Sequence, residues 1–309
     1  MPSYLKVLLY LVATFAAGSL VAPPIFWAGQ ALADAGISGW LAGFPFHRVL
    51  SRCLQVSGVV LLWPALLWIG LRRPSQLGLQ RNPLAVRDVV AGFLVAAGMV
   101  VALAVVYVLT GMFALRPDPD WPALGRIVMT AVAVSGVEEV VFRGVVLGLC
   151  LWTLSARGAI FATTLLFVVV HFIKPAKTVI APEAVRWWSG FAEAARFTDG
   201  LPGGGLLASG AASLFVAGWI LGSAAVRTKS LWLPLGLHAG WVLAQQSSSL
   251  FLRPVLSGGA VSLLPWVGPN LVSGAVPTGL LPLVVLFLTG WLVHLYLRHV
   301  FRPGSARIS

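Results

Sequence analysis

The chain has 309 residues, of which 59% are hydrophobic and 10% are charged, and its mean hydropathy is +0.92. A soluble domain carries about 25% charged residues. The composition therefore excludes an ordinary soluble domain and indicates a polytopic membrane protein built from helices. The formal net charge of +12 does not indicate a nucleic-acid partner, because the basic residues are scattered at predicted helix ends, as in the loops of an inner-membrane protein.

Hydrophobic runs predict an all-α polytopic membrane helix bundle of about eight transmembrane helices, since about 20 apolar residues span a bilayer. The runs lie near residues 4–22, 53–71, 89–115, 127–151, 157–173, 206–226, 231–250 and 280–297. The first run ends at Pro23-Pro24 and is expected to be a retained helix, because it is longer than the core of a signal peptide. We divide the chain into N-terminal helices (1–125), a core (126–250) and a C-terminal part (251–309).

Two connections have features of their own. A helix is predicted from Pro182 to Phe197, with Pro182 in its first turn. The pair Trp187-Trp188 favours a helix that lies in the membrane interface, and the alternative is an ordinary surface helix. Residues 253–279 are rich in Gly, Pro and Ser yet apolar, which predicts a loop against the membrane surface, followed by the last helix and a basic tail.

The distribution of basic residues predicts the orientation. Eight helices place both termini on one side, and the connections on that side hold eleven basic residues: Lys6, Arg72, Arg73, Arg81, Arg87, Arg157, Arg227, Lys229, Arg298, Arg302 and Arg307. The short connections on the other side hold five: Arg48, Arg52, Arg116, Arg126 and Arg253. Cytoplasmic loops carry the excess of Lys and Arg, so both termini are expected in the cytoplasm of a bacterial-type inner membrane.

The fourth predicted helix carries two adjacent carboxylates, Glu138 and Glu139, and Arg143 near mid-membrane depth. Ionisable groups there cost on the order of 2.5–3.5 kcal/mol each, so they face a cavity or one another. Glu139 and Arg143 are four residues apart and can form an ion pair on one helix face. Glu138 points about 100° away from Glu139 and is left available for chemistry.

Two histidines, His171 and His238, lie inside apolar runs, whereas the other three histidines suit the interface. A lone histidine in such a run is usually a core residue. Two of them on separate helices, together with a buried Glu pair, indicate a shared polar site. From the predicted helix ends, the two histidines differ in depth by roughly 10 Å, which tilted or longer helices would remove.

This set of side chains fits peptide hydrolysis. A buried Glu near another carboxylate can act as general base on a water. A neutral imidazole can share that water or bind zinc with the Glu, and a second histidine can stabilise an oxyanion. Neither a Gly-x-Ser-x-Gly motif nor a His-Glu-x-x-His motif is present in the sequence.

The pattern resembles the CPBP family, which includes the type 2 CAAX prenyl proteases, their bacterial relatives and the bacteriocin-processing or self-immunity (Abi-like) proteins. The likeness covers residues 126–250 and rests on three motifs in order: Glu138-Glu139-x-x-x-Arg143, Phe167-x-x-x-His171, and His238 after Leu233-Pro234-Leu235-Gly236-Leu237.

The resemblance implies an eight-helix intramembrane endopeptidase that cleaves a membrane-associated peptide or protein. It implies that Glu138 activates water, that His171 assists it and that His238 stabilises the oxyanion, while Glu139 and Arg143 form a structural pair. The family is described both as metalloprotease and as glutamate-dependent. If zinc is used, Glu138, His171 and His238 would be its ligands, and the sequence leaves that choice open.

One position departs from the family pattern. The family carries Asn four residues after the last His, and Val242 stands there. Gln245 lies on the same helix face seven residues after His238. The hypothesis is that its amide supplies the missing oxyanion donor; the alternative is that it caps a polar cluster with Gln246.

Two other functions stay open beside the protease. Val242 motivates a non-catalytic membrane scaffold or a bacteriocin-immunity-type protein that kept the fold. Buried Glu and His residues also serve proton-coupled transporters. The transporter is disfavoured because the sequence shows neither internal repeats nor matched interrupted helices.

Overall fold

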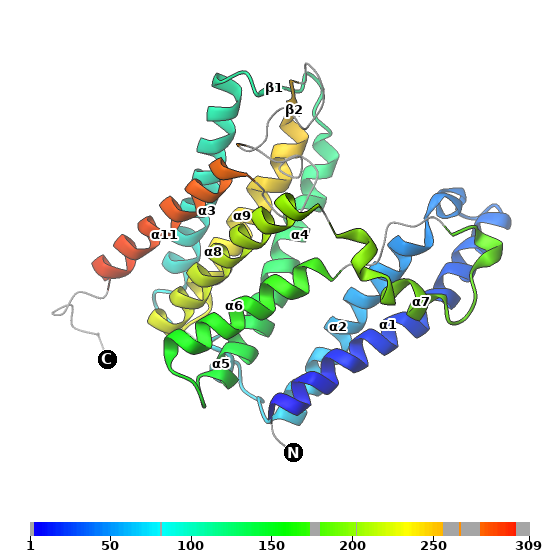
Figure 1. Cartoon of the computed structure of the whole chain (residues 1–309), viewed down its shortest axis with the longest axis horizontal. Coiled ribbons are helices and arrows are strands. Elements are labelled where there is room, and N and C mark those ends of the chain that lie inside the picture. The colour runs from blue at the N-terminus through cyan, green and yellow to red at the C-terminus, as the bar shows by residue number, and fades with distance from the viewer. Residues whose placement is uncertain are drawn as a thin grey trace. The chain divides into compact units, whose positions relative to one another are not determined.

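The computed structural model describes residues 3–80, 82–173, 180–201, 203–255, 266 and 279–300. The chain forms two compact units, one of Met1–Arg72 with Val169–Pro202 and the other of Arg73–Val168 with Gly203–Ser309. The described secondary structure is almost wholly helical (Figure 1). The expected all-α class is therefore confirmed.

The first unit is built on the helices α1 (Ser3–Asp34) and α2 (Phe46–Ile69), which pack against one another. Gly18 of α1 makes this packing close, because a Cβ atom there would lie 2.7 Å from the Cα atom of Leu54. The sequence-based end of the first helix at Pro23-Pro24 is wrong, since α1 continues through both prolines. Proline removes one backbone N–H donor and its ring crowds the preceding turn, yet membrane helices tolerate it because neighbouring helices and small local adjustments satisfy the freed backbone groups.

The predicted helix from Pro182 to Phe197 is also wrong. The structure has a short 3-10 helix η4 (Pro182–Ala184), the helix α7 (Ser189–Ala195) and a second 3-10 helix η5 (Phe197–Gly200). Val185 between η4 and α7 has an extended backbone and is buried with Ala22, Phe26 and Phe46. Burial of the Val185 side chain in this cluster accounts for the break. Trp187 and Trp188 are exposed, which fits both the interfacial prediction and the alternative of an ordinary surface position, so the interfacial placement stays a prediction.

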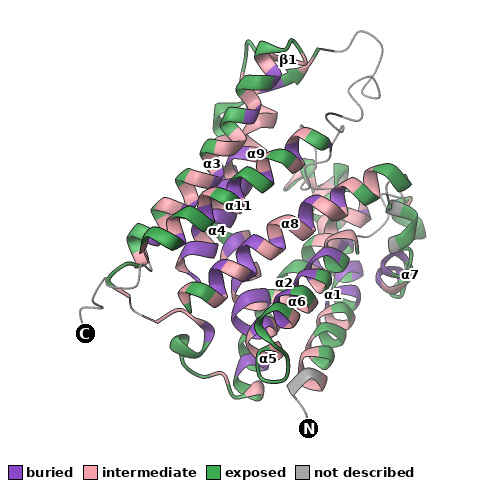
Figure 2. Ribbon diagram, turned by 60° about the vertical axis from the view of Figure 1, so that its left-hand side comes forward, coloured by how far each residue is buried: buried purple, intermediate pink, exposed green. Residues whose placement is uncertain are grey.

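The second unit is organised around α9 (Trp232–Phe251), which packs against α3 (Ala85–Leu109), α4 (Trp121–Glu139) and α8 (Gly204–Thr228). Buried residues concentrate where these helices meet, and exposed residues cover their outer faces (Figure 2). The largest buried cluster combines residues of α3, α8, α9 and α11 (Leu280–Val300). α3 and α11, which the sequence-based division puts outside the core, thus share a compact unit with α4 and α9.

Small residues let α3 and α9 approach closely. A Cβ atom on Gly240 would lie 2.6 Å from the carbonyl oxygen of Phe93, and one on Gly236 would collide with the carbonyl oxygen of Val89. Gly92 on α3 is equally close to α9, because a Cβ atom added to it would lie 2.7 Å from the carbonyl oxygen of Leu233. Glycine at four-residue spacing is the usual means by which membrane helices bring their backbones together.

The remaining helical segments of this unit follow α4 in the chain or pack beside it. The helix after α4 continues as a π-helical segment, η3 (Val140–Val146), and as α5 (Leu147–Cys150), where a single regular helix was expected. α6 (Ala156–Phe172) follows it, and its last residues from Val169 onward fall in the first unit. The short 3-10 helix η2 (Pro74–Leu77) packs against η3.

Two polar features tie distant parts of the second unit together. β1 (Phe113–Leu115) and β2 (Leu252–Pro254) form an antiparallel pair that the sequence did not predict, and Arg116 donates from Nε to the carbonyl oxygen of Leu252. Asp88 of α3 is buried and accepts a hydrogen bond from the Tyr296 hydroxyl of α11 at 2.5 Å. These contacts fix both ends of α3 against its neighbours.

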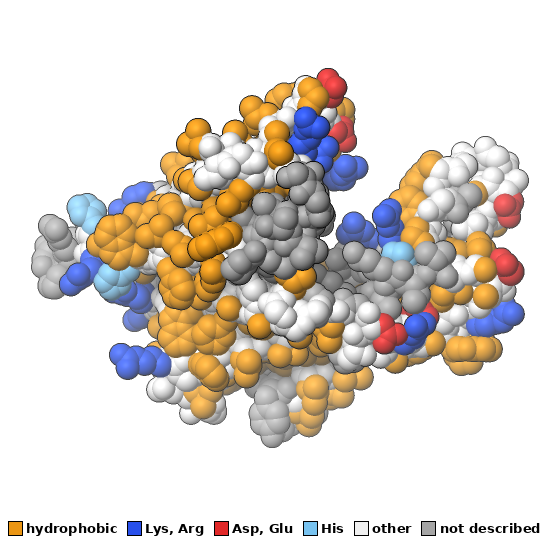
Figure 3. All heavy atoms as spheres, turned by 45° about the horizontal axis from the view of Figure 1, so that its top comes forward, with side chains coloured by type: hydrophobic (Ala, Val, Ile, Leu, Met, Phe, Trp, Pro, Cys, Tyr) orange, Lys and Arg blue, Asp and Glu red, His pale blue; other side chains and the backbone are white. Residues whose placement is uncertain are grey.

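Among the described helices, α1, α2, α3, α8 and α11 are long and apolar enough to cross a membrane, and α6 is apolar but shorter. Hydrophobic side chains cover much of the visible face (Figure 3). The chain is a multi-pass membrane protein, and the count of eight spans stays a prediction. Of the predicted surface loop, residues 256–265 and 267–278 lie outside the described residues, as do Arg302 and Arg307 of the basic tail.

The close approach of α3 and α9 gives a testable prediction. Gly240→Leu should lower the free energy of unfolding by about 1–3 kcal/mol, because its side chain meets backbone that cannot yield. Denaturant titration of the purified protein in detergent measures this loss. Gly98→Leu on α3 is the matched control, since nothing lies within 4 Å of its added Cβ. Equal losses in the two variants would contradict the packing argument.

Candidate active site

The two adjacent carboxylates lie where one helix type changes into another. Glu138 and Glu139 are the last residues of α4, and Arg143 lies within the π-helical segment η3. A π-helix uses i→i+5 hydrogen bonds and occurs mostly as a single turn inside an α-helix, frequently at a functional site. The sequence did not predict this change of helix type. A π-turn holds one residue more than an α-helical turn, and one extra residue within a long apolar run does not alter the apolar pattern enough to be recognised.

Glu139 and Arg143 form the ion pair that their spacing predicts. Arg143 donates from Nη1 to Oε1 of Glu139 at 2.9 Å, and the two side chains are 1% and 0% exposed. The guanidinium also lies over the Phe167 ring, 4.5 Å from its centroid, and Nη2 donates to the carbonyl oxygen of Gly218 at 3.4 Å. The cation is thus held by a carboxylate, an aromatic face and a backbone oxygen.

Glu139 has a second partner that the sequence analysis missed. Nδ1 of His238 on α9 lies 2.7 Å from the same Oε1 atom. A carboxylate oxygen accepts, so the Nδ1 atom carries the hydrogen, and a neutral imidazole then has its lone pair on Nε2. The spacing of residues along one helix could not reveal this bond, because it joins helices that are far apart in the chain.

The other nitrogen of His238 faces Glu138. Nε2 lies 3.8 Å from Oε2 of Glu138, and the two side chains are 9% and 26% exposed. That separation is too long for a direct hydrogen bond. It is short enough for one water that bonds to both, with legs of about 2.8 Å. Glu138 is the more accessible carboxylate, and Glu139 is fully buried behind it.

Helix packing directs His238 toward α4. Gly236 and Gly240 face α3, and His238 is two residues from each of them, which corresponds to about 200° around the helix. The glycine face of α9 therefore lies against α3, and the opposite face presents the imidazole to the carboxylates. Phe167 of α6 completes the surroundings, with its ring centroid 6.5 Å from that of His238.

Two predicted site residues, His171 and Gln245, stay predictions. His171 lies in the last turn of α6, in the part of that helix that belongs to the first unit. The two units are described separately, so the meeting of His171 with Glu138 and His238 stays a prediction. Gln245 lies on α9 seven residues beyond His238, a rise of about 10 Å along the helix axis, and Val242 lies between them.

Within the described ranges, no three His, Cys, Asp or Glu side chains form a group that could hold a metal ion. Part of the predicted ligand set nevertheless has a chemistry that suits zinc. A metal-bound histidine commonly donates its other ring N–H to a carboxylate, and His238 does so to Glu139. His238 Nε2 and Glu138 would be two ligands, and His171 is the third in the sequence-based prediction.

Residues 120–244 match a family model described as type II CAAX prenyl endopeptidase Rce1-like. This part of the chain is therefore similar to the Rce1-like CAAX endopeptidases. The matched segment runs from the N-cap of α4 into the last turns of α9 and contains Glu138, Arg143, His171 and His238. The resemblance seen in the sequence is therefore confirmed. Gln245 lies one residue beyond the match. No curated protein and no solved structure matches the chain.

The buried pair gives the second prediction. Arg143→Leu should lower the free energy of unfolding by about 3–5 kcal/mol, because it leaves the Glu139 carboxylate buried without its cation. The double variant Glu139→Leu with Arg143→Leu should lose less free energy of unfolding than the two single variants added together. A double-mutant cycle measures this difference.

Asp199→Leu is the control for this cycle. Asp199 pairs with Arg196 on the surface of the first unit, where both side chains are exposed, and Arg196 keeps its second partner Glu193 in this variant. Loss of the exposed pair should cost less than about 1 kcal/mol. An effect of Arg143→Leu as small as that of Asp199→Leu would contradict the buried ion pair.

Proposed function

We propose that the protein is an intramembrane endopeptidase in which Glu138 activates a water molecule. The observation that carries the proposal is the facing pair of Glu138 Oε2 and His238 Nε2, 3.8 Å apart, within the segment that matches the Rce1-like endopeptidase family. A general base must lie within reach of the proton that it takes, directly or through one water. The pair meets that requirement for a water placed between the two side chains.

His238 acquires a definite role from its bond to Glu139. With the hydrogen on Nδ1 donated to Glu139, the Nε2 lone pair can accept a hydrogen bond from the same water that Glu138 deprotonates. The water is then held by two acceptors with its oxygen lone pair available. This differs from the oxyanion-stabilising role implied by the family resemblance, since Nε2 donates only in the imidazolium form.

The reaction follows from these positions. Glu138 takes a proton as the water oxygen attacks the peptide carbonyl carbon, which gives a tetrahedral oxyanion. Collapse of that intermediate breaks the C–N bond, and the proton on Glu138 passes to the departing amine. The products are a carboxylate and an amine. Arg143 does not touch substrate in this scheme; it pairs with Glu139, and Glu139 orients the imidazole.

His171 is proposed to assist at the same water. What supports this is its place in the matched segment and in the Phe167-x-x-x-His171 spacing, because Phe167 packs beside both Arg143 and His238. If zinc is the cofactor, Glu138, His171 and His238 would hold it, and bound zinc would lower the pKa of its water. The donor set therefore serves either a metallo- or a glutamate-dependent mechanism.

The proposed substrate is a short peptide segment of a membrane-associated protein. The site lies among membrane helices, so a cleavable bond must come to it from the bilayer or its surface. The excess of basic residues in alternate connections supports a cell inner-membrane location with both termini in the cytoplasm.

The third prediction concerns the base. Glu138→Gln keeps the side-chain shape but cannot accept the proton, so cleavage of membrane protein substrates by the purified protein should fall about 10²–10⁴-fold. A thermal unfolding curve like that of the wild type would show that the fold is kept. Equal cleavage by the two proteins would exclude this site.

The fourth prediction concerns the oxyanion donor. Since Val242 replaces the family's Asn and His238 Nε2 is used as an acceptor, we propose that the Gln245 amide donates to the oxyanion. Gln245→Leu should then lower turnover about as much as His238→Ala, with the larger change in kcat. Gln246→Leu is the neighbouring control and should keep its turnover. Wild-type turnover in Gln245→Leu would refute the hypothesis.

A second candidate is a non-catalytic membrane scaffold that keeps the family fold, and Val242 at the donor position favours it. The two functions differ in their dependence on Glu138. A cellular phenotype that survives Glu138→Ala, in a variant that still folds, would support the scaffold and oppose the protease.

A further inference from the structure

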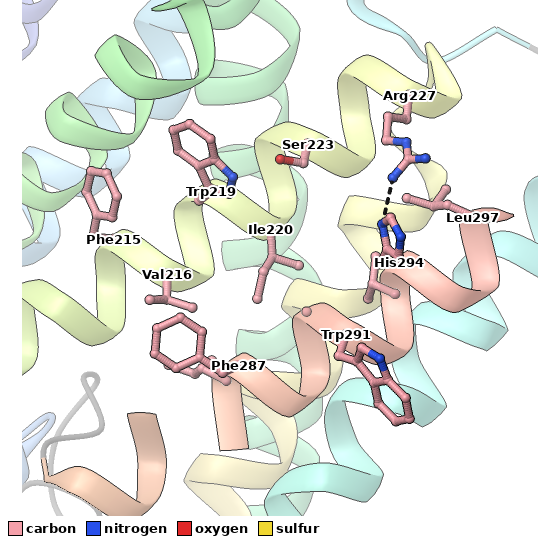
Figure 4. A pocket seen from close by; sticks show the side chains of 13 residues that line it. Phe215, Val216, Trp219, Ile220, Ser223, Arg227, Phe287, Trp291, His294 and Leu297 are labelled. Carbon is pink, nitrogen blue, oxygen red and sulfur yellow. Dashed lines mark hydrogen bonds between the residues drawn. The ribbon is translucent and has the colours of Figure 1, made fainter. Parts of the chain in front are cut away.

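A groove of about 760 Å³ runs between α8 and α11, away from the carboxylates of the candidate active site. Its walls are almost entirely apolar: Phe215, Val216 and Trp219 line it from α8, and Phe287 and Trp291 line it from α11 (Figure 4). Polar side chains lie at one end only, where Ser223, Arg227 and His294 line the groove. The groove therefore has an apolar body and a basic end.

Arg227 is held at that end by a hydrogen bond. Its Nη1 atom donates to Nδ1 of His294 on α11 at 3.1 Å, as the dashed line in Figure 4 marks. In the described part of the chain, the guanidinium has no carboxylate within ion-pair distance. The bond to the neutral ring nitrogen uses one N–H donor and leaves the cation uncompensated, so this end can attract an anion.

The groove has the length of one membrane leaflet. Phe215 and Arg227 are twelve residues apart on α8, which corresponds to about 18 Å. The hydrocarbon core of a bilayer is about 30 Å thick, so one leaflet is about 15 Å deep. A cation at one end and aromatic rings along the body match the headgroup and the acyl chain of a single lipid.

The basic end also lies where the sequence places the interface. Arg227 is in the last turn of α8, close to Lys229, and Arg298 is in the last turn of α11. The positive-charge distribution puts these ends on the cytoplasmic side. Basic pockets between membrane helices on that side are suited to anionic lipid headgroups.

We propose that the groove between α8 and α11 binds one anionic glycerophospholipid of the inner leaflet. Its phosphate accepts hydrogen bonds from Arg227 beside His294, and one acyl chain lies along Trp219, Phe287 and Trp291. The cation at one end favours a lipid over a second copy of the chain. Both could pack against the apolar walls, but the phosphate of a lipid would also pair with Arg227. The site is separate from Glu138 and His238 and does not depend on the proposed proteolysis.

Native mass spectrometry of the full-length protein in a non-ionic detergent tests the headgroup. Phosphatidylglycerol should bind at least tenfold more tightly than phosphatidylcholine with the same acyl chains, as one charge-assisted contact provides. Arg227→Gln should abolish that preference, and Arg227→Lys should keep part of it. Lys229→Gln is the matched control, because Lys229 belongs to the same turn but does not line the groove. Equal binding of the two lipids, or equal losses in Arg227→Gln and Lys229→Gln, would overturn the proposal.

Quenching of tryptophan fluorescence by phosphatidylglycerol with brominated acyl chains tests the chain position. The quenched fraction should fall in Trp219→Phe and in Trp291→Phe, both of which keep an aromatic wall. Unchanged quenching in the double variant would place the lipid elsewhere and overturn the site. Ser223→Trp should fill the groove and lower binding of both lipids. A dimer that Ser223→Trp dissociates would instead identify a second copy as the occupant.

Discussion

The second unit depends on one buried oxygen atom. Oε1 of Glu139 accepts from Arg143 Nη1 and from His238 Nδ1, at 2.9 and 2.7 Å, with no exposure to solvent. A buried carboxylate costs several kcal/mol unless it is paired, so both bonds must form for the chain to fold in this way. The bond to His238 links α4 to α9, and the bond to Arg143 links α4 to η3. A single carboxylate thus fixes His238 relative to Glu138, its neighbour on α4.

Close packing on the other side of α9 makes this arrangement possible. Gly236 and Gly240 bring α9 against the backbone of α3, while His238 points the other way. Between membrane helices there is little hydrophobic driving force, because lipid tails are as apolar as leucine. Packing of small residues and hydrogen bonds between helices provide the association instead. In this unit α9 packs small residues against α3 on one face and forms the hydrogen bond of His238 to Glu139 on the opposite face.

The sequence was informative where the controlling contacts are local. The i,i+4 spacing of Glu139 and Arg143 predicted their ion pair, and long apolar runs predicted the helices. The sequence did not predict contacts between distant segments, which is why the His238–Glu139 bond and the β1–β2 pair were missed. The predicted helix ends were wrong where tertiary packing outweighs the local preference of the residues. α1 continues through Pro23-Pro24, and burial of Val185 interrupts the helix predicted from Pro182 to Phe197.

The π-helical segment η3 has a consequence for how this chain can vary. A π-turn accommodates one residue more than the regular helix around it. Deleting one residue between Val140 and Val146 would restore a uniform helix, and the residues from Leu147 onward would keep nearly the faces that they have now. Leu147 would then stay in its cluster with Ile160 and Leu231. Deleting one residue from the regular helix before Glu138 would instead turn the rest of the helix by about 100° relative to the part before the deletion. The π-helical segment is therefore a place where this helix can lose a residue without turning its carboxylates away from the neighbours that they face.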